Sequence, residues 1–376
     1  MHLLPGLTEL RLAAFKRHRG RTLALSPVTL LAGAPGSGRA SALEACTVLA
    51  RLAGGETLAE SFAPIPGGAP ACVPRSAKPD SEGRRGLRIG CSARGPLGEV
   101  RLDVAVQVEP ELRVVGERLT AAGEQLFSTA LRDPGRRRVQ ASWRTAGLVR
   151  VTRAPLPDDR LGTALLPLRV AGRTEGERLV LRAAEQVVVA LRSLFSCEPQ
   201  PAAMRAPVRA DGAALRRDCG NLAAVLNRVR AECATRHAAL VAAVREGCGG
   251  PLRDLLAEEL PDGTVRAMLD RGGEHGSRAL DTLTDGELRY LGLSLVFLTG
   301  PGVLEVEPAA EVPAALTVLA GGLDRALDAG QCATLVGLAG AMAARGHVRL
   351  LASVDPPGDA GAVRAGEGIA MVDLGA

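Results

Sequence analysis

The chain has 376 residues, enough for two or three domains, and 47% of them are hydrophobic, which is ample for a large core. A net charge of +5 permits an acidic partner such as nucleic acid without requiring one. The eight cysteines are scattered with no Cys-x-x-Cys pair, and the longest apolar run, 290–298, is too short to span a bilayer. We therefore expect no structural zinc and no membrane anchor, but a cytoplasmic protein with reduced thiols.

The start of the chain predicts strands, one helix and a long excursion. Apolar residues alternate with others over 9–14, and the segment 23–25 is suited to pair with them. A continuous apolar run at 28–32 predicts a buried strand, and a helical pattern follows it. Residues 54–86 are rich in Gly, Pro, Ala and Ser, which predicts a long surface excursion.

The middle of the chain changes from sheet to helix. Strict alternation over 87–108 predicts an antiparallel sheet with one solvent-facing side, and short strands are expected through 111–153. Apolar residues then recur at helical spacing from Glu177 to Phe195 and again from Asn221 to Val244. The remaining elements that we expect are a helix at 286–299, a strand at 302–306, helices at 313–327 and 331–344, and strands at 348–352 and 369–374.

A glycine-rich segment, Gly33-Ala-Pro-Gly-Ser-Gly-Arg-Ala-Ser41, separates the strand at 28–32 from the first helix. Glycine lets the backbone curl so that its N–H groups point at a phosphate, and the helix N-terminus adds partial positive charge. The spacing Gly33-x-x-x-x-Gly38 fits a phosphate-binding loop, although Arg and Ala follow where that motif has Lys and then Ser or Thr. The segment is therefore a candidate nucleotide site.

A second motif, Leu283-Thr-Asp-Gly-Glu-Leu-Arg-Tyr290, opens the helix expected at 286–299. Thr284 and Glu287 have the spacing of a capping box, in which each side chain bonds the other residue's backbone N–H. Gly286 permits the close approach of another group, and the helix N-terminus can receive an anion. Two interpretations stay open here, a plain helix cap and an anion site.

Together these segments resemble the ATP-binding-cassette ATPases of the RecF and SMC class, in the short AAA-family form of bacterial genomes. The similar segments are a first strand at 10–16, a Walker A loop at 30–38, a helical-insert motif at 218–226, a signature sequence at 283–290 and a Walker B place at 303–308. The resemblance implies an α/β P-loop NTPase head of the ABC type, with an antiparallel β subdomain and an inserted helical subdomain. The implied parts are an N-terminal lobe at 1–175, a helical insert at 176–275 and a C-terminal lobe at 276–376.

The resemblance also implies a dimer of two heads, either a homodimer or a heterodimer with an active paralogue. ATP would lie between the Walker A loop of one head and the signature helix of the other. The residues that would contact ATP are Gly33, Ala34, Pro35, Gly36, Ser37, Gly38, Arg39, Ala40 and Ser41 from the loop, and Thr284, Asp285, Gly286 and Glu287 from the helix. Glu307 is either the general base or a solvated carboxylate at the end of a strand.

Two departures from the family pattern lie in the Walker A loop. Arg39 keeps the positive charge of the expected Lys, but its longer, planar guanidinium is not equivalent beneath a tight loop. Ala40 lacks the hydroxyl that would coordinate Mg²⁺, and Ser41 lies one helical step away from that direction.

Two further departures concern the Walker B and switch positions. If Glu307 aligns with the catalytic Glu of the family, Val306 replaces the metal-binding Asp, and Glu305 faces the other side of the strand. Val354 stands where a switch His is expected, with Asp355 as a polar replacement. Both protein ligands of Mg²⁺ are then lost, which puts a bound metal in doubt and predicts a large loss of hydrolysis rate.

The remaining candidate residues are less specific. The arginines Arg136, Arg137, Arg138, Arg150 and Arg153 either contact DNA phosphates or belong to a solvated loop. Three histidines, His237, His275 and His347, lack partners at catalytic or metal-ligand spacing.

Three functions therefore stay open. The first, which we favour, is a nucleotide-binding regulatory head with impaired or absent hydrolysis. The second is a working ATPase in DNA repair or phage defence, in which Arg39 serves as Lys does. The third is a structural module that keeps the fold and binds no nucleotide.

Overall fold

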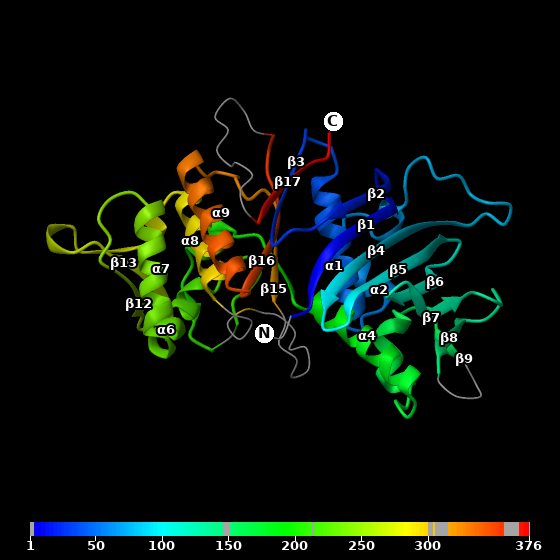
Figure 1. Ribbon diagram of the computed structural model, residues 1–376. Coiled ribbons are helices and arrows are strands. Elements are labelled where there is room, and N and C mark those ends of the chain that lie inside the picture. Colours follow the sequence, from blue (N-terminus) through cyan, green and yellow to red (C-terminus); the bar gives the residue numbers. More distant parts are fainter. Residues whose placement is uncertain are drawn as a thin grey trace. The chain divides into compact units, whose positions relative to one another are not determined.

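The computed structural model describes residues 4–145, 151–212, 214–299, 304, 315–356 and 368–375. The chain divides into two compact units (Figure 1). Unit 1 comprises residues 1–25, 38–194 and 307–315, and unit 2 comprises residues 26–37, 195–306 and 316–376. This division by contacts differs from the lobes expected at 1–175, 176–275 and 276–376, which stay a prediction about functional parts.

Unit 1 is built on an eight-stranded sheet in the order β2-β1-β4-β5-β6-β7-β8-β9, with antiparallel neighbours throughout. Its strands are β1 (Gly6–Phe15), β2 (His18–Ala24), β4 (Arg85–Gly95), β5 (Gly98–Glu109), β6 (Arg113–Ala121), β7 (Glu124–Ala130), β8 (Arg138–Arg144) and β9 (Val151–Pro157). Apolar side chains alternate along these strands because one face of the sheet is covered. The expected antiparallel sheet is therefore confirmed.

Helices cover that face of the sheet. The long helix α4 (Glu175–Arg192) contacts β1 and each strand from β4 to β8, and α1 (Arg39–Ala53) packs on β1 and α4. Two short helices, α2 (Leu58–Phe62) and α3 (Gly162–Leu165), also belong to the unit. Because Leu58 and Phe62 are both buried, the segment 54–86 is not only the surface excursion that its composition predicts.

Unit 2 is built on a five-stranded sheet in the order β10-β15-β16-β3-β17. Its strands are β3 (Val28–Ala32), β10 (Leu194–Cys197), β15 (Leu316–Ala320), β16 (Val348–Ser353) and β17 (Ile369–Asp373). β3 lies between β16 and β17 and is parallel to both, and β15 is parallel to β16. Together with unit 1, this sheet confirms an α/β fold that contains an antiparallel β subdomain.

The helix expected at 313–327 is wrong, because β15 occupies this part of the chain. Its residues, Leu-Thr-Val-Leu-Ala, are all buried, and the strand lies between β10 and β16. The β-branched Thr317 and Val318 suit such a strand. The strand expected at 302–306 lies outside the described residues except for Leu304, which forms a parallel bridge to Leu215.

The helices of unit 2 are α5 (Pro201–Met204), α6 (Leu222–Glu232), α7 (Ala234–Gly247), α8 (Asp285–Leu298) and α9 (Ala329–Ala344). The helical region expected at 221–244 consists of two helices, because the backbone at Cys233 departs from helical geometry, with φ −151° and ψ 88°. Phe195 is on β10, beyond the end of α4. A small sheet adjoins α6, with strands β11 (Val208–Arg209), β12 (Asp254–Glu259), β13 (Thr264–Asp270) and β14 (Ser277–Ala279), so the insert is not purely helical.

The packing of α7 against α8 requires a residue without a side chain at position 247. A Cβ atom there would lie 2.1 Å from the buried ring of Tyr290, whose hydroxyl donates a hydrogen bond to the Ala243 carbonyl. Gly247→Ala is expected to lower the free energy of unfolding by about 1–3 kcal/mol through overpacking. Gly337→Ala in α9 is the control, because a Cβ there meets nothing within 4 Å, and it should stabilise by about 0.5–1 kcal/mol. Urea unfolding curves that move alike for both variants would contradict this.

Candidate nucleotide-binding site

The glycine-rich loop takes a backbone shape that requires glycine. Gly33, Gly36 and Gly38 have φ angles of 148°, 86° and 98°. Side chains rarely tolerate such positive values, so these three positions select glycine. Residues up to Ser37 belong to unit 2 and residues from Gly38 belong to unit 1, so the two ends of the loop are described in turn.

The first part of the loop folds over Ser37. The Ser37 N–H donates to the Ala34 carbonyl at 2.9 Å, and the Ala34 N–H donates to the Gly375 carbonyl at 3.3 Å. Ser37 is only 3% exposed, and its hydroxyl has no hydrogen-bond partner among the described residues. A Cβ atom on Gly33 would lie 2.6 Å from that hydroxyl. Since buried hydroxyls are normally hydrogen-bonded, the Ser37 hydroxyl is an unsatisfied polar group in this part of the loop.

The second part of the loop leads into α1. No side chain caps this helix and its first turn holds no acidic residue, so backbone N–H groups there are suited to an anion. His18 lies against the loop, and its Nε2 donates to the Gly38 carbonyl at 3.0 Å. A Cβ atom on Gly38 would lie 2.4 Å from Nε2. His18 was not singled out from the sequence, because its contact spans 20 residues.

His18 should make stability depend on pH. Burial lowers the pKa of His18, and the positive charges of nearby Arg21 and Arg17 lower it further. The hydrogen bond to Gly38 partly opposes this shift. The unfolded chain therefore binds the proton more readily, and stability falls as pH drops through about 6.5. His18→Gln, which keeps a donor, is expected to flatten the change in urea midpoint between pH 7.5 and 5.5. The exposed His347 supplies the control His347→Gln, and an equal pH response in all three proteins would contradict the assignment.

In unit 2, no carboxylate directly follows β3, β16 or β15, whereas β17, the other parallel neighbour of β3, ends in Asp373, which accepts the Gly375 N–H at 2.8 Å. β3, β16 and β15 are parallel, so their carboxyl ends lie at one edge of the sheet, where ligands of α/β sheets bind. Gly33 follows β3, Val354 follows β16, and Gly321 with Gly322 follows β15. The Gly322 N–H donates to the Ser353 hydroxyl at 2.8 Å, and the buried Val354 N–H donates to the Leu31 carbonyl at 3.0 Å.

After β15 and β16, the nearest carboxylates along the chain are Asp324 and Asp355. One Asp324 oxygen accepts the Asp355 backbone N–H at 2.7 Å, which ties the two turns together. Within the described ranges, no group of three His, Cys, Asp or Glu side chains is arranged to hold a metal ion. Glu305, Val306, Glu307 and Pro308 lie outside the described residues.

The capping box predicted at the start of α8 is confirmed. The Glu287 N–H donates to the Thr284 hydroxyl at 3.2 Å, and the Thr284 N–H donates to the Glu287 carboxylate at 2.9 Å. The other Glu287 oxygen accepts the Gly249 N–H at 3.1 Å. The Asp285 carboxylate accepts a hydrogen bond from the Arg205 guanidinium at 2.7 Å. None of the contacts recorded for these residues in the described ranges joins them to the glycine loop.

Gly286 and Arg289 connect α8 to the turn after β15. A Cβ atom on Gly286 would lie 2.1 Å from the Ala326 carbonyl oxygen, so the close approach that this glycine permits is that of its own chain. The buried Arg289 donates to three carbonyls, those of Gly322 at 2.9 Å and of Arg325 and Pro199 at 3.0 Å. The sequence did not predict this buried role of Arg289, because an arginine within a helix is normally expected to face solvent.

No family model matches the chain, and no curated protein matches it. Several solved structures are similar in fold. They include an SMC head bound to the C-terminal winged-helix domain of ScpA (12% identity, 95% of this chain and 91% of that one, TM-score 0.48). An SMC head domain from Thermotoga maritima is 13% identical over 95% and 90% of the two chains (TM-score 0.41), and RecF of the RecFOR pathway is 9% identical over 98% of each (TM-score 0.42). At these identities the likeness concerns the fold alone. Among the described helices, none has the length and apolar character needed to cross a membrane.

Proposed function

We propose that the protein binds the phosphates of ATP with the loop from Gly33 to Ser41 and hydrolyses ATP weakly or not at all. The observation that carries the proposal is the loop itself, which places three positive-φ glycines between a buried parallel strand and a helix without a side-chain cap. The buried Ser37 hydroxyl without a partner supports a ligand there. The third function, a structural module that binds no nucleotide, explains neither the positive-φ glycines of the loop nor the unpartnered Ser37 hydroxyl.

The impaired chemistry follows from the edge of the sheet rather than from the loop alone. We place the Walker B position at Gly321, because β15 is the strand that enters the parallel sheet after α8. This replaces Val306 in the alignment made from sequence, and neither residue is a metal ligand. With Ala40 in the loop and Val354 after β16, no side chain of a Mg²⁺ site remains at these positions. ATP would therefore be held by backbone N–H groups and by Arg39.

The signature helix suits an ATP sandwich between two heads. Thr284 and Glu287 are committed to their own cap, while the N-terminal end of α8 still offers the positive end of a helix dipole. We propose a homodimer, or a heterodimer with an active paralogue, in which this end meets the γ-phosphate held by the partner's loop. DNA would be a further partner of such an assembly.

Calorimetric titration with ATP separates the three functions. We expect submillimolar affinity that changes less than threefold when Mg²⁺ is replaced by EDTA, together with negligible phosphate release. Mg²⁺-dependent turnover near one per second would establish the active ATPase instead. Absence of binding at millimolar ATP would establish the structural module. Sedimentation velocity with and without ATP then tests the dimer.

A further inference from the structure

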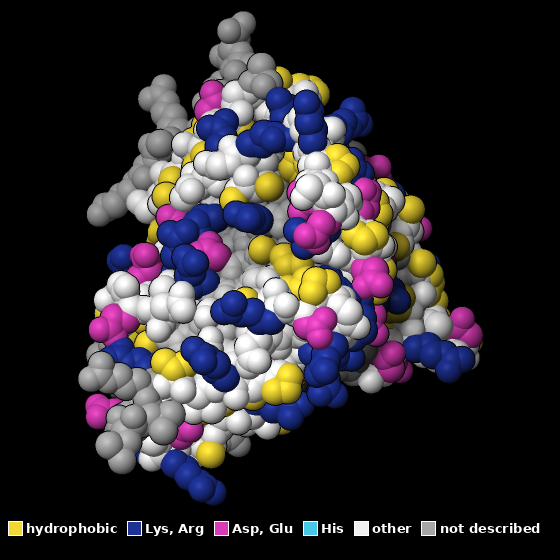
Figure 2. All heavy atoms as spheres, turned by 90° about the vertical axis from the view of Figure 1, so that its right-hand side faces the viewer, with side chains coloured by type: hydrophobic (Ala, Val, Ile, Leu, Met, Phe, Trp, Pro, Cys, Tyr) yellow, Lys and Arg dark blue, Asp and Glu magenta, His cyan; other side chains and the backbone are white. Residues whose placement is uncertain are grey.

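The outer face of the eight-stranded sheet holds a polar hollow of about 620 Å³. It lies wholly within unit 1, on the face opposite α4. Five arginines and two carboxylates line it, together with hydroxyl and amide groups such as those of Thr22, Gln125 and Ser128. Figure 2 shows this side of the molecule, where Lys and Arg side chains surround a depression.

Small residues on the central strands create the hollow. The cross-strand row that begins at Arg88 continues through Ala105 on β5 and Gly116 on β6. Because these two have little or no side chain, the surface is low between the longer side chains around them. A Cβ atom on Gly116 would meet nothing closer than 3.6 Å, and its φ is not positive, so packing does not explain this glycine.

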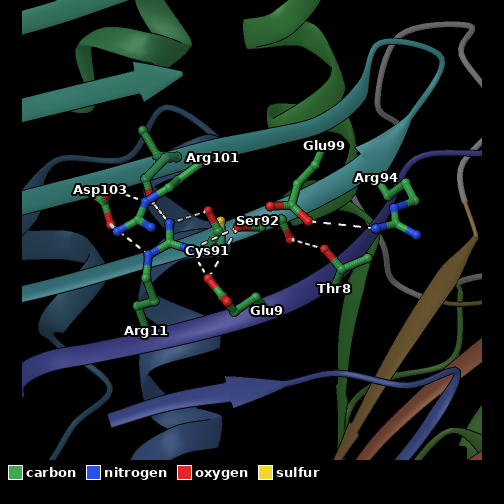
Figure 3. Close-up of polar contacts among 10 residues, drawn as sticks. Thr8, Glu9, Arg11, Cys91, Ser92, Arg94, Glu99, Arg101 and Asp103 are labelled. Carbon is green, nitrogen blue, oxygen red and sulfur yellow. Dashed lines mark hydrogen bonds and ion pairs between the residues drawn. The ribbon is translucent and has the colours of Figure 1, made fainter. Parts of the chain in front are cut away.

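An ion network fixes the floor of the hollow (Figure 3). One carboxylate oxygen of Asp103 accepts a hydrogen bond from Arg11, and the other accepts one from Arg101, both at 2.7 Å. The buried Arg11 also donates to Ser92, Glu9 and the carbonyls of Cys91 and Leu102, so all its nitrogens are engaged. Burial alone would raise the pKa of Asp103, but the bonds from Arg101 and Arg11 lower it overall. This floor is rigid and charged.

Two arginines on the rim have no such partners. Arg88 and Arg118 are exposed, and within the described part of the chain neither side chain has a hydrogen bond or an ion pair. They lie on β4 and β6, whose backbones are about 10 Å apart because one strand separates them. Their flexible side chains can therefore reach one ligand from two sides. Guanidinium groups match phosphate oxygens with paired, charge-assisted hydrogen bonds.

We propose that this hollow binds a small molecule with a di- or triphosphate group, either inorganic or as part of a nucleotide. The excess of arginine over carboxylate complements several negative charges, and the volume is that of a small-molecule site. Beyond the hollow, Arg94 is ion-paired with Glu99 and Arg144 with Glu124. These carboxylates favour a compact anion over a polymer that continues along the sheet. The site is separate from the glycine loop and does not depend on its function.

The test removes the two rim charges. Wild-type protein titrated with tripolyphosphate, ATP or GTP at 50 mM salt should bind one equivalent in the hollow, besides any bound by the loop. The double variant Arg88→Gln, Arg118→Gln is expected to bind that equivalent with at least tenfold lower affinity. Arg138→Gln with Arg153→Gln is the matched control, because both side chains are exposed, unpaired within the described ranges and outside the hollow. Comparing tripolyphosphate with the two nucleotides shows which source of phosphate the site prefers.

A second variant tests the hollow by filling it. Gly116→Leu should block the same equivalent while urea unfolding stays cooperative. If the loop fails to bind ATP, binding of a single equivalent of ligand that the double variant Arg88→Gln, Arg118→Gln weakens still supports the hollow as a site. The proposal is overturned if the rim variant binds like the wild type. It is also overturned if the control pair weakens binding as much, or if a 20-base-pair duplex DNA competes better than tripolyphosphate, since either result indicates an extended polyanion surface.

Discussion

Gly33→Val is expected to weaken ATP binding at least a hundredfold. A side chain at this position would collide with the Ser37 hydroxyl, 2.6 Å from the new Cβ atom, and with the Gly375 carbonyl oxygen at 3.0 Å. Its φ of 148° is also unfavourable for a β-branched residue. The loop would have to open, and its N–H groups would no longer converge on a phosphate. Isothermal titration with ATP measures the loss.

The control for Gly33→Val is Gly346→Val. Gly346 also has a positive φ, of 73°, but a Cβ atom there meets nothing within 4 Å and the residue lies after α9. It should cost stability through its backbone alone and leave the ATP affinity within twofold. Equal affinity in the wild type and Gly33→Val, with both folded, would mean that nucleotide does not use this loop.

Restoring two metal ligands should make ATP binding depend on Mg²⁺. The double variant Ala40→Ser, Gly321→Asp supplies a hydroxyl in the loop and a carboxylate at the end of β15. Mg²⁺ prefers such oxygen ligands together with phosphates, so it should tighten ATP binding at least tenfold relative to EDTA. Gly321 does not have a positive φ, so its backbone tolerates the new side chain.

The matched comparison is Ala40→Ser with Val306→Asp, which puts the carboxylate where the sequence alignment placed it. If the Walker B position is at Gly321, this second pair should remain insensitive to Mg²⁺. The reverse result would return the assignment to Val306. Direct titrations with Mg²⁺ at saturating ATP distinguish the two.

Sequence reasoning succeeded where a local pattern determined the structure. The alternation in β4 and β5, the apolar run of β3 and the helical faces of α4 and α8 each reflect burial of neighbouring residues. The capping box at Thr284 is equally local, since both of its bonds span three residues.

It failed where the deciding partner is distant. The run at 316–320 is too short to separate strand from helix, and only its place between β10 and β16 makes it a strand. The Walker B position that we propose at Gly321 depends on recognising this strand, and the flanking Gly321 and Gly322 were a signal for a strand end. The role of Gly286 against Ala326 and the contact of His18 with Gly38 depend on tertiary approach, which no spacing reveals.

The position of β3 in its sheet has a consequence for folding. β3 begins at Val28, but both of its neighbours, β16 and β17, start about 320 residues later or more. During synthesis an apolar strand and the loop that follows it must wait, unpaired, until almost all of the described chain has emerged. Such long-range pairing is slow and exposes the strand to aggregation. Truncations that remove β16 and β17 should therefore abolish nucleotide binding as completely as mutations in the loop itself.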